Sequence, residues 1–140
     1  MVTINKSIFK AYDIRGIYNT DIDEDVVRLI AQGLALMWEE GVIVVARDGR
    51  HGGKELAQAL MTEIRSSGQR LGKKFTLIDA GVATTPMYYF VVNHLSATGG
   101  AMVTASHNPK EYTGIKAVSQ YALPVVSKDL LDLMEREHIV

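Results

Sequence analysis

The residues best suited to chemistry are a serine and a histidine in the segment TASHNP, residues 104–109. An apolar run, residues 99–103, precedes this segment, and its Asn-Pro pair favours a turn. A buried strand that ends in such a turn would hold the Ser106 hydroxyl in solvent, beside the His107 imidazole and backbone amides that can bind an anion. The same residue types are common in ordinary surface turns. The segment predicts a site where Ser106 could carry a covalent group.

A hydrolytic Ser-His pair is disfavoured here. Neighbouring residues of an extended chain point to opposite sides, whereas a catalytic base must lie within hydrogen-bonding distance of its nucleophile. The nucleophile elbow G-x-S-x-G is also missing, because Thr104 and Asn108 occupy its glycine positions. An independent phosphatase or esterase that uses Ser106 and His107 is therefore the weakest hypothesis.

The sequence contains no good match to a nucleotide-binding phosphate loop or to a zinc-binding helix. Residues 49–54 resemble a nucleotide-binding phosphate loop, but the spacing is one residue short and Glu55 stands where Ser or Thr would hold magnesium. His51, His94 and His138 lack the i, i+4 spacing of a zinc-binding helix. We expect no autonomous nucleoside triphosphatase, although the glycines could let a helix N-terminus approach an anion.

The composition disfavours nucleic acid and membranes as partners. The 140 residues carry 15 basic and 16 acidic side chains, a net charge of −1, so no overall field would attract either. No run approaches the roughly 20 apolar residues of a membrane span. The absence of cysteine favours a cytoplasmic location over secretion.

Because no overall field attracts an anion, any bound anion must be held by local basic groups. The basic residues near turn signals are Arg15, Arg47, Arg50, Lys54, Lys110 and Lys116.

Strand and helix signals alternate along the chain. Runs rich in β-branched residues predict buried strands, and apolar residues at helical spacing predict helices between them. The predicted strands are residues 42–45, 75–78, 101–104 and 115–118. The predicted helices are residues 54–70, 86–95, about 23–40 with Asp21 and Glu24 as its cap, and one that Ser127 caps and that carries Leu130, Leu131 and Met134. This order predicts an α/β fold in a single domain of residues 1–140, a three-layer α/β/α sandwich with a mixed, mostly parallel sheet.

Three loops are expected at one edge of that sheet. Ligands of open α/β sheets bind beyond the carboxyl ends of the strands. Residues 47–53, 81–86 and 106–114 all follow predicted strands at this edge. We therefore expect the Ser106 turn and the RDGRHGG segment to lie on one face.

Two strings far apart in the chain resemble a known family. Residues 9–16 read FKAYDIRG and residues 99–116 read GGAMVTASHNPKEYTGIK. Together they resemble the alpha-D-phosphohexomutases, the family that includes bacterial phosphomannomutase/phosphoglucomutase. Residues 47–50, RDGR, are similar to a family segment that usually reads G-R-D-x-R, with Ala46 in place of the glycine. The YDIRG form favours mannose and glucose phosphates as substrates.

The resemblance implies that a serine carries a phosphoryl group. Ser106 would be the phosphoserine that gives this group to a hexose monophosphate, and the hexose 1,6-bisphosphate so formed would turn over and return its other phosphate. His107 and Asn108 would help to position the serine. In the family, Mg²⁺ bridges the phosphoserine and an aspartate-rich loop, so here the phosphate on Ser106 would be the metal ligand.

The resemblance also implies which residues handle charge and protons. Phosphoryl transfer depends mostly on alignment and on charge placed near the equatorial oxygens. The family residues implicated in proton transfer correspond to Arg15 and Lys116. Because arginine is a poor base, we assign the proton to Lys116 and the charge to Arg15. Tyr12 would line the substrate side, and Arg47 would bind phosphate.

Members of this family are longer than this sequence. They have roughly four domains in about 450 residues, a length that itself predicts several domains. The family's D-G-D-G-D-R metal loop, sugar-selecting loop and arginine-rich phosphate loop have no counterpart here. We expect an N-terminal domain that needs the remaining domains to complete the reaction. The alternative hypothesis is a non-catalytic phosphate-binding or sugar-phosphate-binding module with the same fold, in which Ser106 stays unphosphorylated.

Overall fold

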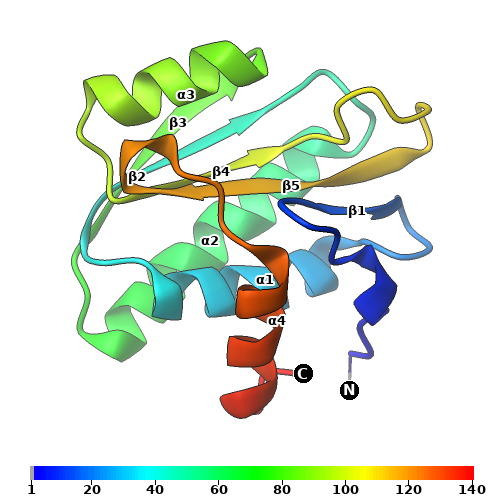
Figure 1. Cartoon of the computed structure of the whole chain (residues 1–140), viewed down its shortest axis with the longest axis horizontal. Coiled ribbons are helices and arrows are strands. Elements are labelled where there is room, and N and C mark those ends of the chain that lie inside the picture. Colours follow the sequence, from blue (N-terminus) through cyan, green and yellow to red (C-terminus); the bar gives the residue numbers. More distant parts are fainter. Residues whose placement is uncertain (1) are drawn as a thin grey trace.

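One five-stranded sheet organises the computed structural model of the chain, which describes residues 2–140 (Figure 1). The strands are β1 (Ile14–Ile17), β2 (Gly41–Arg47), β3 (Phe75–Val82), β4 (Gly99–Val103) and β5 (Tyr112–Ser119). Their order across the sheet is β1-β5-β4-β2-β3. β2 is parallel to β3 and β4, whereas β5 is antiparallel to both β4 and β1. β5 alone therefore runs against the other strands, and the predicted mixed, mostly parallel sheet is confirmed.

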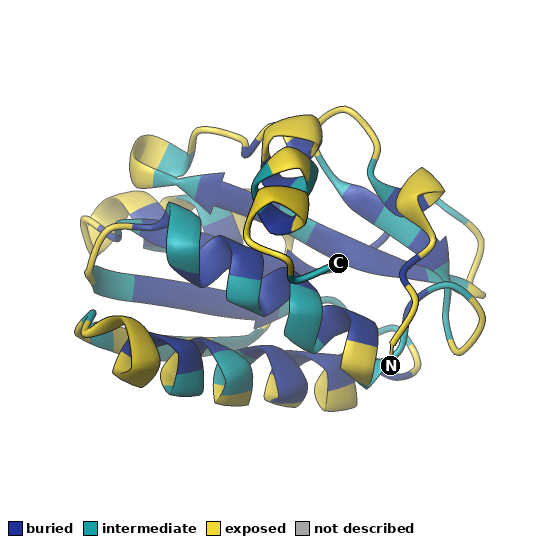
Figure 2. Cartoon of the chain, turned by 90° about the horizontal axis from the view of Figure 1, so that it is seen from below, coloured by how far each residue is buried: buried dark blue, intermediate teal, exposed yellow. Residues whose placement is uncertain are grey.

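Helices cover both faces of the sheet unequally. They are α1 (Glu24–Met37), α2 (Gly53–Leu71), α3 (Thr85–His94) and α4 (Ser127–Arg136), with short 3₁₀ turns η1 (Lys6–Ile8) and η2 (Gln120–Ala122). α1, α2 and α4 pack on one face and α3 on the other (Figure 1). Buried and exposed residues alternate along α1 and α2, and most of the buried ones belong to the core on this face of the sheet (Figure 2). α4 packs on α1, where its buried Leu130 and Met134 lie against Gly33. The predicted three-layer α/β/α sandwich is confirmed.

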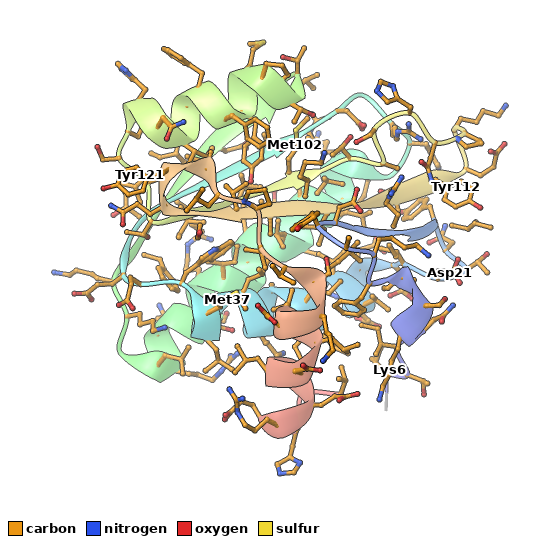
Figure 3. All side chains as sticks on the ribbon, viewed as in Figure 1. Lys6, Asp21, Met37, Met102, Tyr112 and Tyr121 are labelled. Carbon is orange, nitrogen blue, oxygen red and sulfur yellow. The ribbon has the colours of Figure 1, made fainter. Side chains whose placement is uncertain are left out.

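Each face of the sheet has its own apolar core. Met37 lies on the α1 side and Met102 on the α3 side (Figure 3). The indole N–H of buried Trp38 donates to the Val118 carbonyl at 3.0 Å on the first side. On the second side the hydroxyl of buried Tyr88 donates to a backbone carbonyl of β5 at 3.0 Å. Both large aromatic side chains thus satisfy their polar atoms while they fill the core.

The predicted strands and helices all form, with boundaries that differ by a few residues. The predicted cap of α1 was wrong: the Asp23 carboxylate, not that of Asp21, accepts from the Val26 amide at 2.9 Å. α1 ends at Met37 rather than residue 40. Ser127 does not cap α4 either, because it is the first residue of that helix.

Ser127 instead attaches α4 to the start of the chain. Its hydroxyl donates to the Asp13 carbonyl at 3.0 Å, and its amide donates to the Ala11 carbonyl at 3.1 Å. These bonds hold the segment directly before β1. Strand β1 itself was not predicted.

Within residues 2–140 no helix combines the length and the apolar character needed to cross a bilayer.

Candidate functional site

The Ser106 turn lies where β4 ends, as predicted. Ser106 is half-buried and has a φ of 54°, in the left-handed region. Its amide donates to the Thr104 hydroxyl at 3.0 Å, and the Asn108 amide donates to the Ala105 carbonyl at 3.1 Å. The sequence predicted that backbone amides of this turn can bind an anion, but the amides of Ser106 and Asn108 are used to close the turn instead.

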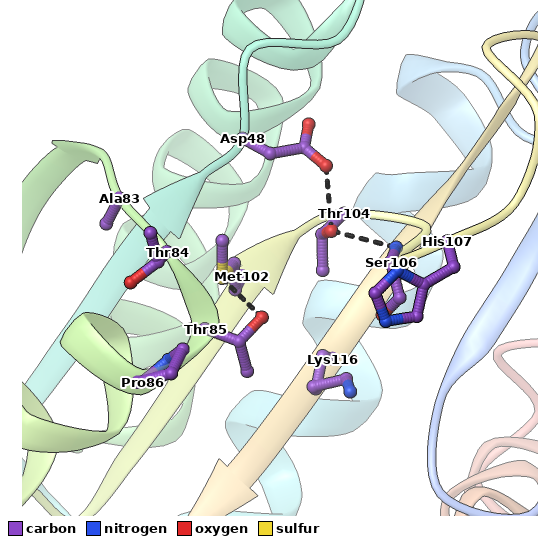
Figure 4. A pocket seen from close by; sticks show the side chains of 10 residues that line it. All are labelled: Asp48, Ala83, Thr84, Thr85, Pro86, Met102, Thr104, Ser106, His107 and Lys116. Atoms are coloured by element: carbon purple, nitrogen blue, oxygen red, sulfur yellow. Dashed lines mark hydrogen bonds between the residues drawn. The ribbon is translucent and has the colours of Figure 1, made fainter.

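Ser106 lines a cavity of about 550 Å³ at the carboxyl edge of the sheet (Figure 4). Residues from the ends of β2, β3 and β4, from the start of α3 and from β5 contribute to it. The lining residues are Asp48, Ala83, Thr84, Thr85, Pro86, Met102, Thr104, Ser106, His107 and Lys116. The expectation that the Ser106 turn and the segment after β2 meet on one face is thereby confirmed.

Lys116 projects from β5 into the same cavity as Ser106 and His107 (Figure 4). It pairs with Met102 of β4, so both side chains lie on the α3 face of the sheet. Behind it, the Tyr88 hydroxyl donates to the Lys116 carbonyl. Burial raises the pKa of Tyr88 well above its usual value, so this hydroxyl stays protonated and remains a donor. α3 thus fixes the backbone from which the Lys116 amine extends.

Arg15 reaches the serine turn from β1. Its Nη1 donates to the Asn108 side-chain oxygen at 2.9 Å, and its Nε pairs with the Asp13 carboxylate at 3.1 Å. Arg15 pairs with Gly114 in the sheet, two residues from Lys116 on the same face. The two strings that carry the family resemblance, about 90 positions apart, therefore lie side by side.

Tyr12 and Arg47 lie outside the cavity lining. Tyr12 is 60% exposed, in the turn that precedes β1. The Arg47 side chain lies on the α1 face of the sheet, opposite to the face that carries Lys116. Its Cδ is 4.0 Å from the point that a Cβ on Gly53 would occupy. The structure brings Ser106, His107 and Lys116 into one cavity and leaves these two apart from it.

Sequence reasoning missed the roles of Asp48 and Arg50. The Asp48 carboxylate lines the cavity and accepts from the Thr104 hydroxyl at 2.7 Å. Arg50 was noticed only as one of several basic residues near turns, yet its guanidinium donates to backbone carbonyls of the Ser106 loop. The RDGR segment was the available signal.

The residues present do not form a magnesium site by themselves. Within residues 2–140 no three His, Cys, Asp or Glu side chains are grouped so as to hold a metal ion. Asp48 is the single carboxylate in the cavity lining, and Thr104 and Arg50 already bond to it. A magnesium ion at this place would need oxygen ligands from a phosphate and from groups outside these residues.

The sequence profile of the family described as "Phosphoglucomutase/phosphomannomutase, alpha/beta/alpha domain I" matches residues 6–137. The chain belongs to this family. A phosphohexose mutase of Xanthomonas campestris pv. campestris (strain B100) is 42% identical over 119 residues, which is 85% of this chain and 25% of that protein. A phosphomannomutase/phosphoglucomutase of Pseudomonas syringae pv. tomato is 36% identical over 115 residues, 80% of this chain and 23% of that protein.

Solved structures agree with this phosphohexomutase assignment. A crystal structure of a phosphoglucomutase/phosphomannomutase family protein from Burkholderia thailandensis superimposes with a TM-score of 0.81 at 34% identity, over 96% of this chain and 30% of that one. The resemblance seen in the sequence and the α/β/α fold are both confirmed. The chain spans about a quarter of the length of the curated phosphohexomutases it matches.

Proposed function

We propose that this phosphohexomutase domain carries the phosphoserine of an enzyme that interconverts hexose 1-phosphates and hexose 6-phosphates through a hexose 1,6-bisphosphate. The observation that carries the proposal is the shared cavity of Ser106, His107 and Lys116, formed in part by the TASHNP segment of the family. Mannose and glucose phosphates are the proposed substrates. A serine on a closed turn that shares a cavity with an amine supports this proposal, because phosphoryl transfer depends on alignment and charge.

In the proposed step, the bond between phosphorus and Oγ of phosphorylated Ser106 breaks while a bond to a sugar hydroxyl oxygen forms. Lys116, as the free amine, takes the proton of that hydroxyl, and this proton passes on to the serine oxygen as it leaves. Arg15 contributes positive charge from β1, and Asn108, to which it donates, helps to fix the turn. In the second half of the cycle the other phosphate of the bisphosphate returns to Ser106.

We assign the missing parts of the site to the remaining domains of the enzyme. The α3 face of the sheet is open beside the cavity, and the carboxylate ligands for Mg²⁺ must come from outside residues 2–140. We expect this chain alone to give no turnover with sugar phosphate, magnesium and bisphosphate, and clear mutase activity would contradict that expectation. We also propose a cytoplasmic location, which fractionation of the source cells tests.

The deciding experiment is peptide mapping by mass spectrometry of the protein isolated from its own cells. We expect a phosphoryl group on Ser106. Ser96 is a matched control, because it also has a left-handed backbone, with a φ of 49°, but is exposed after α3 and lies outside the cavity lining. An unphosphorylated Ser106 in protein from growing cells would instead favour the hypothesis of a non-catalytic sugar-phosphate-binding module.

A further inference from the structure

We propose that Arg50 is a positioning residue that holds the Ser106 loop in the conformation needed for phosphoryl transfer. The consequence for transfer rests on the proposed function, whereas the mechanical role does not. Arg50 is not among the residues that line the cavity. It would therefore act on the loop, not on the substrate.

The guanidinium of Arg50 donates to four backbone carbonyls of one loop. Nη1 donates to the oxygens of Pro109 at 2.7 Å and Tyr112 at 3.1 Å. Nη2 donates to the oxygens of Ser106 at 2.7 Å and Asn108 at 2.7 Å. The Arg50 side chain is only 17% exposed. Because hydrogen bonds from a charged donor are stronger than neutral ones, this set of bonds attaches the loop firmly to the segment that follows β2.

Asp48 fixes the direction of this guanidinium and joins it to the serine. Its carboxylate accepts from Arg50 Nε at 3.2 Å and from the Arg50 amide at 3.1 Å. The same carboxylate accepts from the Thr104 hydroxyl, which in turn accepts from the Ser106 amide. Ser106 is thus held through its amide by Asp48 and Thr104, and through its carbonyl by Arg50.

This arrangement requires an arginine. A planar guanidinium with five N–H donors can serve several carbonyls at once, whereas the compact ammonium of lysine cannot span them. The pair of Asp48 and Arg50 is neutral overall, so it adds no net charge beside a phosphate. Its contribution is geometric, and a displacement of about 1 Å at a reacting group can cost roughly 100-fold in rate.

The first test compares R50K with R65K, a matched change at an exposed arginine of α2. We expect hydrogen exchange at amides 105–112 to accelerate by about tenfold or more in R50K, with β4 protected as before, and to stay unchanged in R65K. Loop protection in R50K equal to that of the wild type would overturn the proposal.

A measurement on the wild-type protein covers the case in which R50K does not fold. Four carbonyl partners would stop rotation of the guanidinium, so NMR of ¹⁵N-labelled arginine side chains is expected to resolve separate Nη–H signals for Arg50. Arg65 is expected to give one averaged signal. An averaged signal for Arg50 would equally overturn the proposal.

The catalytic test uses the full-length enzyme. We expect R50K to lower kcat by roughly 100-fold with little change in KM for sugar phosphate, because the change displaces the serine that carries the phosphoryl group and leaves the substrate contacts in place. Wild-type kcat in R50K would contradict a positioning role. If the loop loosens in R50K but wild-type protein has neither phosphoserine nor mutase activity, the loop-holding role stands and the proposed function fails.

Discussion

Ser106 adopts a backbone conformation that a non-glycine residue avoids. With a φ of 54° its Cβ crowds its own backbone, which costs about 1 kcal/mol or more. The Ser106 amide donates to the Thr104 hydroxyl and Arg50 donates to the Ser106 carbonyl, and these two bonds hold the residue in this conformation. Glycine would adopt this conformation without strain, so the serine is retained at a cost in stability. Such a cost is common at functional sites, where a particular side chain is needed.

Replacing Ser106 by two small residues would measure this strain. S106G and S106A both delete the hydroxyl, but only alanine keeps the Cβ that strains the left-handed backbone. We expect S106G to be more stable than S106A by about 1 kcal/mol, measured by urea denaturation of the purified domain. Equal stability of the two variants would show that the turn relaxes and that Ser106 is not strained.

Single residues differ in how well the sequence predicts their place. Ser106, His107 and Lys116 follow or occupy strong strand signals, and the structure brings them into one cavity. The role of Arg50 could not be predicted, because its partners are backbone carbonyls 56 to 62 positions away that carry no mark in the sequence. A residue type reveals what a side chain can donate, but not which backbone atoms the fold places in front of it.

Strand β1 also could not be predicted from its own residues. It has only four residues, with an arginine and a glycine among them, so no local pattern marks it as a strand. It forms because it pairs with β5, which lies about 100 positions away. The pairing is unusually close at Gly114, where a Cβ would stand 1.8 Å from the Ile14 carbonyl oxygen. This close approach brings Arg15 to the serine turn.

G114A is therefore expected to displace β1. The added methyl group cannot fit against the Ile14 carbonyl, so the strands must separate, and the domain should lose about 3 kcal/mol in urea denaturation. The bond from Arg15 to Asn108 should break as well, which NMR of the Arg15 side chain would report. G49A is the control, because nothing lies within 4 Å of a Cβ there, and we expect no loss. Wild-type stability in G114A would contradict this account of β1.

The end of β1 is also sensitive to acid through Asp21. The Ile17 amide and then the Asn5 side chain donate to its carboxylate, and they lower the pKa of Asp21 below its ordinary 3.8. A carboxyl with a lowered folded-state pKa stabilises the fold above its unfolded pKa and loses that effect as pH falls through the folded value. We expect wild type to exceed D21A in stability at neutral pH, with a difference that shrinks below about pH 4. A difference independent of pH from 7 to 3 would be inconsistent with these bonds to the charged carboxylate.

For the molecule as a whole, the three layers could be predicted, but the unequal distribution of helices over the two faces of the sheet could not. Alternating strand and helix signals are sufficient for an α/β sandwich, since parallel strands need crossover helices. The distribution of helices over the faces depends on strand order, which the signals do not encode. Three helices cover one face and α3 alone covers the other. The cavity with Ser106 and Lys116 exists because α3 leaves part of its face open.

We expect the two cores to unfold together as one cooperative unit. Adjacent residues of β2 face opposite ways, with Val44 in the α3 core and Val45 in the α1 core, so neither core can dissolve without loosening the strand that both share. We expect methyl NMR signals of Val92, in the α3 core, and Val27, in the α1 core, to disappear at the same urea concentration. Loss of the Val92 signal at distinctly lower urea would mean that α3 detaches first. The cavity would then be held by a separate, weaker unit, and residues 1–140 would not behave as one domain.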